Sequence, residues 1–157
     1  MALKFAQMIY SFVLVLFTAI LSKYFVDVGL DSFYETINVS NATPENNYFT
    51  YVWRIIYFLL FLSFYIILIS KKTTEQFNDA NVLFVLQLFL QVLWCFSFFY
   101  MGQFIASSIV IVLLFLLVLL MMHSFFQINK LAFGLNIPYA IWILFASFLN
   151  IYISFAN

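Results

Sequence analysis

The stretch Asn136–Asn150, NIPYAIWILFASFLN, lies inside the last apolar segment of the chain. Spacings of three, four and four residues place four of its side chains on one helical face: Tyr139, Trp142, Ala146 and Asn150. Most of the remaining residues are Ile, Leu and Phe, which lipid solvates readily. A phenol, an indole and an amide need hydrogen-bond partners, so this face is predicted to point toward other helices or toward a ligand.

The composition is that of an integral membrane protein. The 157 residues are 67% hydrophobic and 8% charged, whereas soluble domains carry roughly 25% charged residues. A formal net charge of zero argues against nucleic acid as a partner. With one cysteine and one histidine, no metal site is expected, and no catalytic triad or phosphate-binding loop is visible.

Five apolar segments are each long enough to cross a bilayer. They predict an all-α membrane protein with a single domain, a five-transmembrane-helix bundle with spans at about 5–26, 48–70, 82–100, 104–126 and 132–155. Five spans put the two termini on opposite sides. Lysines 4, 71, 72 and 130 then oppose Lys23 and Arg54, and this excess of positive charge predicts an amino terminus on the inside.

The polar stretch 27–47 is predicted to be an acidic loop. A loop of this length in so short a protein is usually functional or disordered, and we interpret it as a lid over a pocket mouth. Two sequons, Asn38-Val39-Ser40 and Asn41-Ala42-Thr43, would accept glycans only on a lumenal face.

Two further segments carry polar and aromatic side chains on one helical face. Segment three has Gln87, Gln91, Trp94 and Phe98, and segment two has Trp53 and Tyr57 one turn apart. If the three faces meet, they enclose an aromatic-walled pocket. Alternatively, they interlock and leave no void. Arg54 either contacts an anionic ligand group or extends to the lipid headgroups.

Three motifs on these segments resemble those of the TspO/translocator protein family, also called tryptophan-rich sensory proteins or peripheral benzodiazepine receptors. Pro138–Asn150, PYAIWILFASFLN, is similar to the family's fifth-helix pattern PYxxW-xxFA-xxLN. Val52–Tyr57, VWRIIY, resembles VWxxLY of the second helix, and Gln87–Phe99, QLFLQVLWCFSFF, resembles QLxLNxxWxxxFF of the third. The motifs occur in the family's order.

Some positions depart from the family's patterns. Gln91 stands where the third helix has an Asn, and Cys95 stands where Ser is common. Ala42 occupies the place of the second Trp in the loop motif. No basic residue follows Tyr152, so the fifth helix lacks a cholesterol-recognition pattern.

The resemblance implies a five-helix bundle, often a homodimer, in the mitochondrial outer membrane or a bacterial membrane. It implies a pocket for porphyrins, sterols or benzodiazepine- and isoquinoline-type ligands, lined by Trp53, Trp142 and Gln91, with Ala146 leaving room for a bulky ring. Together with the three faces, it gives a set of expected ligand-binding residues on helices two, three and five: Trp53, Tyr57, Gln91, Trp94, Tyr139, Trp142, Ala146 and Asn150.

Three functions are compatible with these observations. The first is a receptor or carrier for flat hydrophobic ligands such as porphyrins or sterols, with no resident cofactor. The second is light-dependent porphyrin breakdown, a reaction that in the resembled family is attributed to pocket tryptophans. Ala42 stands in place of one loop tryptophan, which argues against this function. The third is an interaction or scaffold protein whose polar faces only hold helices together.

Overall fold

The computed structural model describes the backbone of residues 2–36 and 46–156 and the side chains of residues 2–30 and 49–156. Its helices are α1 (Ala2–Thr36), α2 (Asn46–Ile69), α3 (Thr74–Cys95), the π-helical turn η1 (Phe96–Tyr100), α4 (Phe104–Ile128), α5 (Lys130–Leu135) and α6 (Ile137–Ala156). Within the described residues, five stretches are long and apolar enough to cross a membrane: Ala2–Leu30, Phe49–Ile69, Thr74–Tyr100, Phe104–Ile128 and Lys130–Ala156. The predicted five-helix bundle is confirmed.

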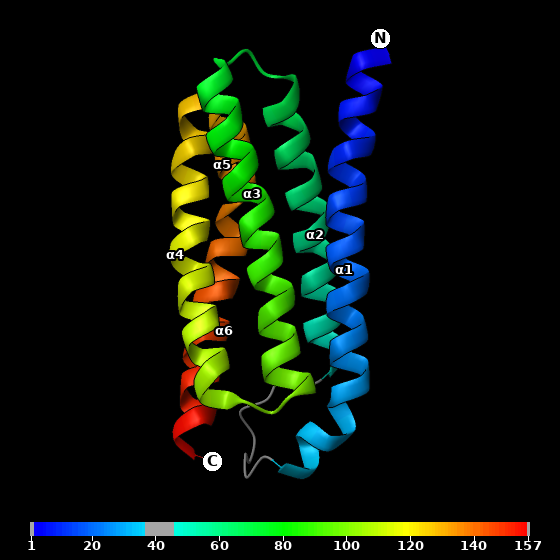
Figure 1. Ribbon diagram of the computed structural model, residues 1–157, viewed down its shortest axis with the longest axis vertical. Coiled ribbons are helices and arrows are strands. Elements are labelled where there is room, and N and C mark those ends of the chain that lie inside the picture. The colour runs from blue at the N-terminus through cyan, green and yellow to red at the C-terminus, as the bar shows by residue number, and fades with distance from the viewer. Residues whose placement is uncertain (1, 37–45, 157) are drawn as a thin grey trace.

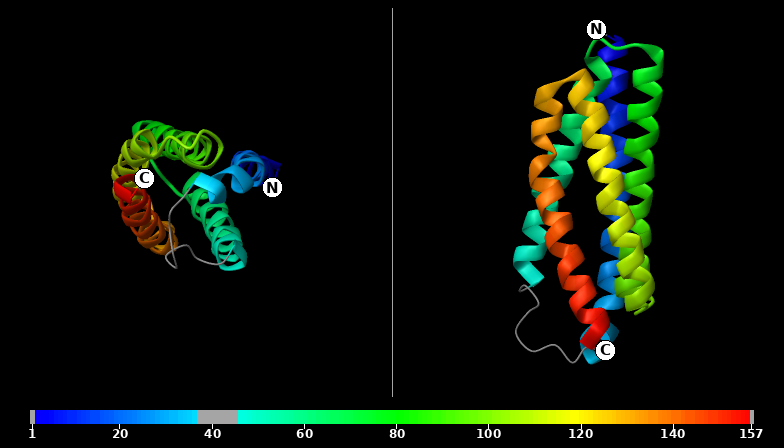
Figure 2. Two further views of the ribbon diagram at one scale, coloured as in Figure 1. Left: turned by 90° about the horizontal axis from the view of Figure 1, so that it is seen from below. Right: turned by 90° about the vertical axis from the view of Figure 1, so that its left-hand side faces the viewer.

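The helices run along one long axis, and the two ends of the chain lie at opposite ends of the bundle (Figure 1). Helix α4 packs between α3 and α6, whereas α1 packs against α2, α3 and η1. Helix α2 contacts the short α5, but α2 and α6 diverge toward the end where the chain finishes (Figure 2). Aromatic side chains span this divergence, as described below.

The outer surface of the bundle is apolar. Leu3, Ile105 and Phe148 are 73%, 74% and 67% exposed, and many other large aliphatic and aromatic side chains point outward with them. Water would solvate such a surface poorly, but the hydrocarbon of a bilayer solvates it well. The chain is therefore a multi-pass membrane protein, with lipid as its surroundings.

Helix α1 continues to Thr36, so the predicted loop at 27–47 is wrong for residues 27–36. Pro44 is the first proline after this helix starts, and nothing before it removes a backbone donor. An ion pair between Lys23 and Asp27, one turn apart, bridges the predicted boundary. The rest of that loop, including Ala42, both sequons and the proposed lid, lies outside the described residues.

Helix α3 begins at Thr74, eight residues before the predicted start at 82. The Thr73 hydroxyl accepts a hydrogen bond from the Gln76 backbone N–H at 3.2 Å, and the Gln76 side-chain oxygen accepts one from the Thr73 N–H at 3.0 Å. This capping box satisfies backbone donors that a helix start leaves unpaired. The polar residues 74–81 are therefore helical.

The last segment is not one continuous helix, as predicted for 132–155, but is divided at Asn136 into α5 and α6. Pro138 has no N–H, so it cannot bond the carbonyl of Gly134 as a helix requires. The Asn136 side chain donates to the Ala132 carbonyl at 2.7 Å and to the Ser63 hydroxyl of α2. At this break, Asn136 therefore links the last span to α2.

Helix α1 approaches η1 closely at Gly29. A Cβ atom at Gly29 would lie 2.2 Å from the backbone oxygen of Phe99 and 2.8 Å from the backbone nitrogen of Tyr100. The π-helical turn continues with a 3.0 Å hydrogen bond from the Met101 N–H to the Phe96 carbonyl, and Gly102 then reverses the chain with φ 61°. Only a glycine allows this approach of two backbones.

We expect Gly29→Ala to destabilise the bundle by roughly 1–3 kcal/mol, because its methyl group meets backbone atoms that cannot rotate away. Gly134→Ala is the matched control. Nothing lies within 4 Å of a Cβ at Gly134, and alanine favours a helix by about 0.5–1 kcal/mol. Thermal unfolding in detergent measures both. Equal unfolding temperatures for the two variants would contradict the close approach.

Candidate functional site

A hydrogen-bonded chain of four side chains joins α2, α3 and α6. The Tyr139 hydroxyl lies 2.7 Å from Gln87 Oε1 and 2.8 Å from Gln91 Oε1. Gln91 Nε2 lies 3.2 Å from the Tyr57 hydroxyl. Tyr139, Gln87 and Gln91 are completely buried, where an unpaired polar group is costly. The predicted faces of segments two, three and five therefore do meet, through Tyr57, Gln91 and Tyr139.

A second polar cluster joins α3, α4 and α6. Trp94 Nε1 donates to Asn150 Oδ1 at 2.7 Å. The Asn150 amide nitrogen in turn donates to the hydroxyls of Ser107 and Ser108 at 3.1 and 2.8 Å and to the Phe104 carbonyl at 3.3 Å. Asn150 and Trp94 are buried, so this cluster satisfies two polar side chains inside the membrane and fixes α6 against α4.

Trp53 is the centre of the aromatic contacts. Its ring centroid lies 6.3 Å from that of Trp94 and 6.4 Å from those of Tyr139 and Trp142. Phe49 lies 5.8 Å from Trp142, so rings of α2 and α6 meet where the two helices diverge. Such tilted and edge-to-face pairs favour packing. In the described part of the chain, the buried Trp142 Nε1 has no hydrogen-bond partner.

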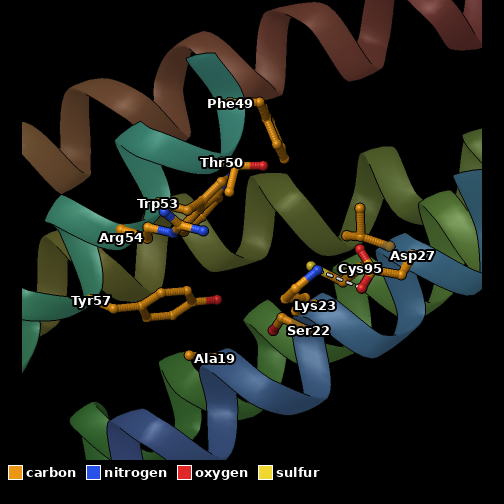
Figure 3. A pocket seen from close by; sticks show the side chains of 11 residues that line it. Ala19, Ser22, Lys23, Asp27, Phe49, Thr50, Trp53, Arg54, Tyr57 and Cys95 are labelled. Atoms are coloured by element: carbon orange, nitrogen blue, oxygen red, sulfur yellow. Dashed lines mark hydrogen bonds and ion pairs between the residues drawn. The ribbon is translucent and has the colours of Figure 1, made fainter. Parts of the chain in front are cut away.

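A cavity of about 160 Å³ lies between α1 and α2 and reaches α3. Figure 3 shows Tyr57 pointing from α2 toward α1, opposite Ser22 and near Cys95. The lining residues are Ala19, Ser22, Lys23, Val26, Asp27, Phe49, Thr50, Trp53, Arg54, Tyr57 and Cys95. Its walls are mainly apolar or aromatic, and its charged side chains are Lys23, Asp27 and Arg54.

Two of the eight expected ligand-binding residues, Trp53 and Tyr57, line this cavity. Gln91, Trp94, Tyr139 and Trp142 lie behind them, joined to Trp53 or Tyr57 by the ring contacts and hydrogen bonds given above. Ala146 and Asn150 are buried in α6 and are not among the lining residues. Ligand contact by these eight residues stays a prediction.

The contribution of α1 to the cavity is absent from the sequence-based set. Ser11, Thr18 and Ser22 are buried, at spacings of seven and four that repeat along one helical face. Small polar residues on an otherwise apolar helix mark a packed face. That pattern was available in the sequence and would have pointed to Ser22 as facing the bundle.

Cys95 lines the cavity, and His123 does not. Cys95 is a buried free thiol, and His123 lies away from the cavity, 3.0 Å from the Gln127 side chain. Within residues 2–36 and 46–156, no group of His, Cys, Asp and Glu side chains is placed to hold a metal ion. Aromatic walls, hydroxyl groups and the cationic side chains of Lys23 and Arg54 suit an apolar ligand with a polar end.

We expect Asn150→Ala to lower the stability of the bundle by roughly 1–3 kcal/mol, since it leaves Trp94 Nε1 buried without an acceptor. Asn81→Ala removes an amide whose hydrogen-bond partner, Tyr10, is exposed, and it should lower the stability much less. Unfolding in a denaturing detergent compares the two. In a double-mutant cycle, Trp94→Phe should cause little further loss of stability once Asn150→Ala is present. Additive losses would contradict the contact between the two side chains.

Comparison with known proteins agrees with this architecture. Residues 11–156 match the TspO/MBR family. The chain is 33% identical to the tryptophan-rich protein TspO of Chlorobaculum tepidum over 118 residues, 75% of each chain. It is 29% identical to a tryptophan-rich sensory protein of Cereibacter sphaeroides over 120 residues, 76% of this chain and 73% of the relative. The chain belongs to the TspO/MBR family.

Proposed function

We propose that this protein is a membrane receptor or carrier for flat hydrophobic ligands such as porphyrins or sterols. The observation that carries the proposal is the cavity between α1 and α2, walled by Phe49, Trp53 and Tyr57. Aromatic walls with a few polar groups are typical of small-molecule sites. Ligand rings would stack on Trp53, whose own ring contacts lead to Trp94 and Trp142. A sensory role named for one relative is consistent with ligand recognition.

The size of the cavity sets a condition on binding. At about 160 Å³, it is smaller than the roughly 300–1,000 Å³ of drug-sized sites. A porphyrin therefore enters only if aromatic side chains move. Phe49, Trp53 and Trp142 bridge the diverging ends of α2 and α6, and separating these rings would enlarge the space without breaking a backbone hydrogen bond. Binding by this route requires a shift of side chains more than of helices.

We expect saturable quenching of tryptophan fluorescence when the detergent-solubilised protein is titrated with protoporphyrin IX in the dark, at concentrations on the order of micromolar. Trp53→Phe should raise the Kd roughly two- to tenfold by weakening ring stacking. Gln91→Ala should also raise it, because Tyr57 loses its partner. Gln127→Ala, which removes a glutamine near the opposite end of the bundle, is the matched control.

The absence of saturable binding with protoporphyrin IX, cholesterol and an isoquinoline ligand alike would overturn the proposal. The polar faces would then serve helix packing alone, as in an interaction or scaffold protein. Equal loss of affinity in Gln91→Ala and Gln127→Ala would show that the change acts through general stability.

Light-dependent porphyrin breakdown is a second candidate, favoured by the edge-to-face contact of Trp53 and Trp142 at 6.4 Å. Two adjacent indoles beside a bound porphyrin are suitably placed for photochemistry. Under illumination, the wild type should convert protoporphyrin IX to a new product faster than heat-denatured protein does. Trp142→Phe should slow this conversion while leaving binding in the dark detectable. Identical rates with native and denatured protein would exclude the enzyme.

A further inference from the structure

The hydrogen-bonded chain behind the cavity has a preferred direction. Tyr139 has one phenolic hydrogen, but its oxygen lies within hydrogen-bond distance of two amide oxygens, those of Gln87 and Gln91. One of these two amides must therefore be turned so that its nitrogen faces Tyr139. The choice decides whether the Tyr57 hydroxyl donates to Gln91 or accepts from it.

The surroundings of Gln87 decide between the two arrangements. As placed, its amide nitrogen is buried with no partner in the described part of the chain. Turning Gln87 lets that nitrogen donate to Tyr139 and leaves an unpaired oxygen instead. Turning Gln91 would leave the Gln87 nitrogen unpaired. A buried donor without a partner is rarer than an under-satisfied carbonyl oxygen, so Gln87 turns and Gln91 stays.

In this arrangement Gln87 donates to Tyr139, Tyr139 to Gln91, and Gln91 to Tyr57. The Tyr57 oxygen is already an acceptor, so its hydrogen remains available to the cavity that Tyr57 lines. Its hydroxyl points toward α1, where Ser22 lies (Figure 3). The Ser22 hydroxyl is buried, lines the same cavity and has no hydrogen-bond partner in the described part of the chain. Two hydroxyl groups, those of Tyr57 and Ser22, therefore face the cavity and can donate to a ligand.

The charges around the cavity have the complementary sign for an anion. Lys23, Asp27 and Arg54 line it, and Lys23 is paired with Asp27. Arg54 forms no ion pair among the described side chains and lies over the Tyr51 ring, 5.6 Å from its centroid. One positive charge among the described lining residues therefore remains uncompensated, beside apolar walls where charge interactions are less screened than in water.

We propose that this cavity selects ligands carrying a carboxylate, which accepts hydrogen bonds from Tyr57 and Ser22 and pairs with Arg54. The inference rests on the proposed function and narrows its ligand class to carboxylate-bearing amphiphiles over neutral sterols. A carboxylate offers several acceptor sites, and hydrogen bonds to an ionised acceptor are about twice as strong as neutral ones. A sterol hydroxyl has no charge for Arg54 to pair with.

The test compares each acid with its ester, using protoporphyrin IX and its dimethyl ester, and oleate and methyl oleate. The wild type should bind each acid roughly tenfold more tightly than its ester. Tyr57→Phe, Ser22→Ala and Arg54→Gln should each lower the affinity for the acids by a larger factor than that for the esters, because an ester carbonyl is a weaker, uncharged acceptor. Tyr65→Phe and Lys71→Gln, which change residues outside the cavity lining, are the matched controls.

The outcomes separate this inference from the proposed function. If porphyrin acid and ester bind equally, or if the variants weaken both alike, the carboxylate inference fails and the receptor remains. If only the oleate pair shows the acid preference and its loss in the variants, the carboxylate site stands and the flat-ligand receptor fails. If no probe binds, both fail. Unfolding temperatures near wild type confirm that the single-atom changes Tyr57→Phe and Ser22→Ala leave the fold intact.

Discussion

The interior of this bundle depends on the hydrogen bonds between Tyr139 of α6 and two glutamines of α3, Gln87 and Gln91. A further bond from Gln91 to Tyr57 extends them to α2. Inside a bilayer, apolar side chains gain little by leaving lipid for protein, so packing and internal hydrogen bonds specify which helix faces meet. These side chains join three helices that are distant in sequence. They also place Tyr57 at the wall of the cavity, so the same contacts that hold the helices orient the group that a ligand meets.

The break at Asn136 extends the same logic to the other end of the bundle. Pro138 has no backbone N–H. In an uninterrupted helix the carbonyl one turn earlier would therefore stay unpaired, which costs several kcal/mol in lipid. Here the Asn136 amide replaces part of the lost bonding and reaches the Ser63 hydroxyl of α2, which itself donates to the Ala132 carbonyl at 3.0 Å. Helix α2 is therefore tied to α5 near one end and separated from α6 by aromatic rings near the other. The side chains that can shift without breaking these hydrogen bonds, the aromatic rings between α2 and α6, therefore lie beside the cavity.

The elements that could be predicted are those with a strong local signal. Apolar length alone identifies five spans, and helical spacing alone puts Tyr57, Gln91 and Tyr139 on faces that meet. The early start of α3 has a local signal too, since Thr73 and Gln76 form a capping box, whereas the polar composition of 74–81 predicts a loop. The continuation of α1 past Asp27 brings Gly29 against the η1 backbone, a tertiary contact that no local pattern predicts. The spacing of Ser11, Thr18 and Ser22 marks the face of α1 that packs into the bundle, but only the structure shows that this face borders a cavity.

The clustering of all three tryptophans has a consequence for the protein's optical behaviour. Indole rings with centroids 6.3 and 6.4 Å apart are close enough to exchange excitation energy. Light absorbed by Trp94 or Trp142 is therefore shared with Trp53, which borders the cavity. The tryptophan emission therefore reports on one small volume. An energy acceptor bound beside Trp53 would quench the emission of all three tryptophans.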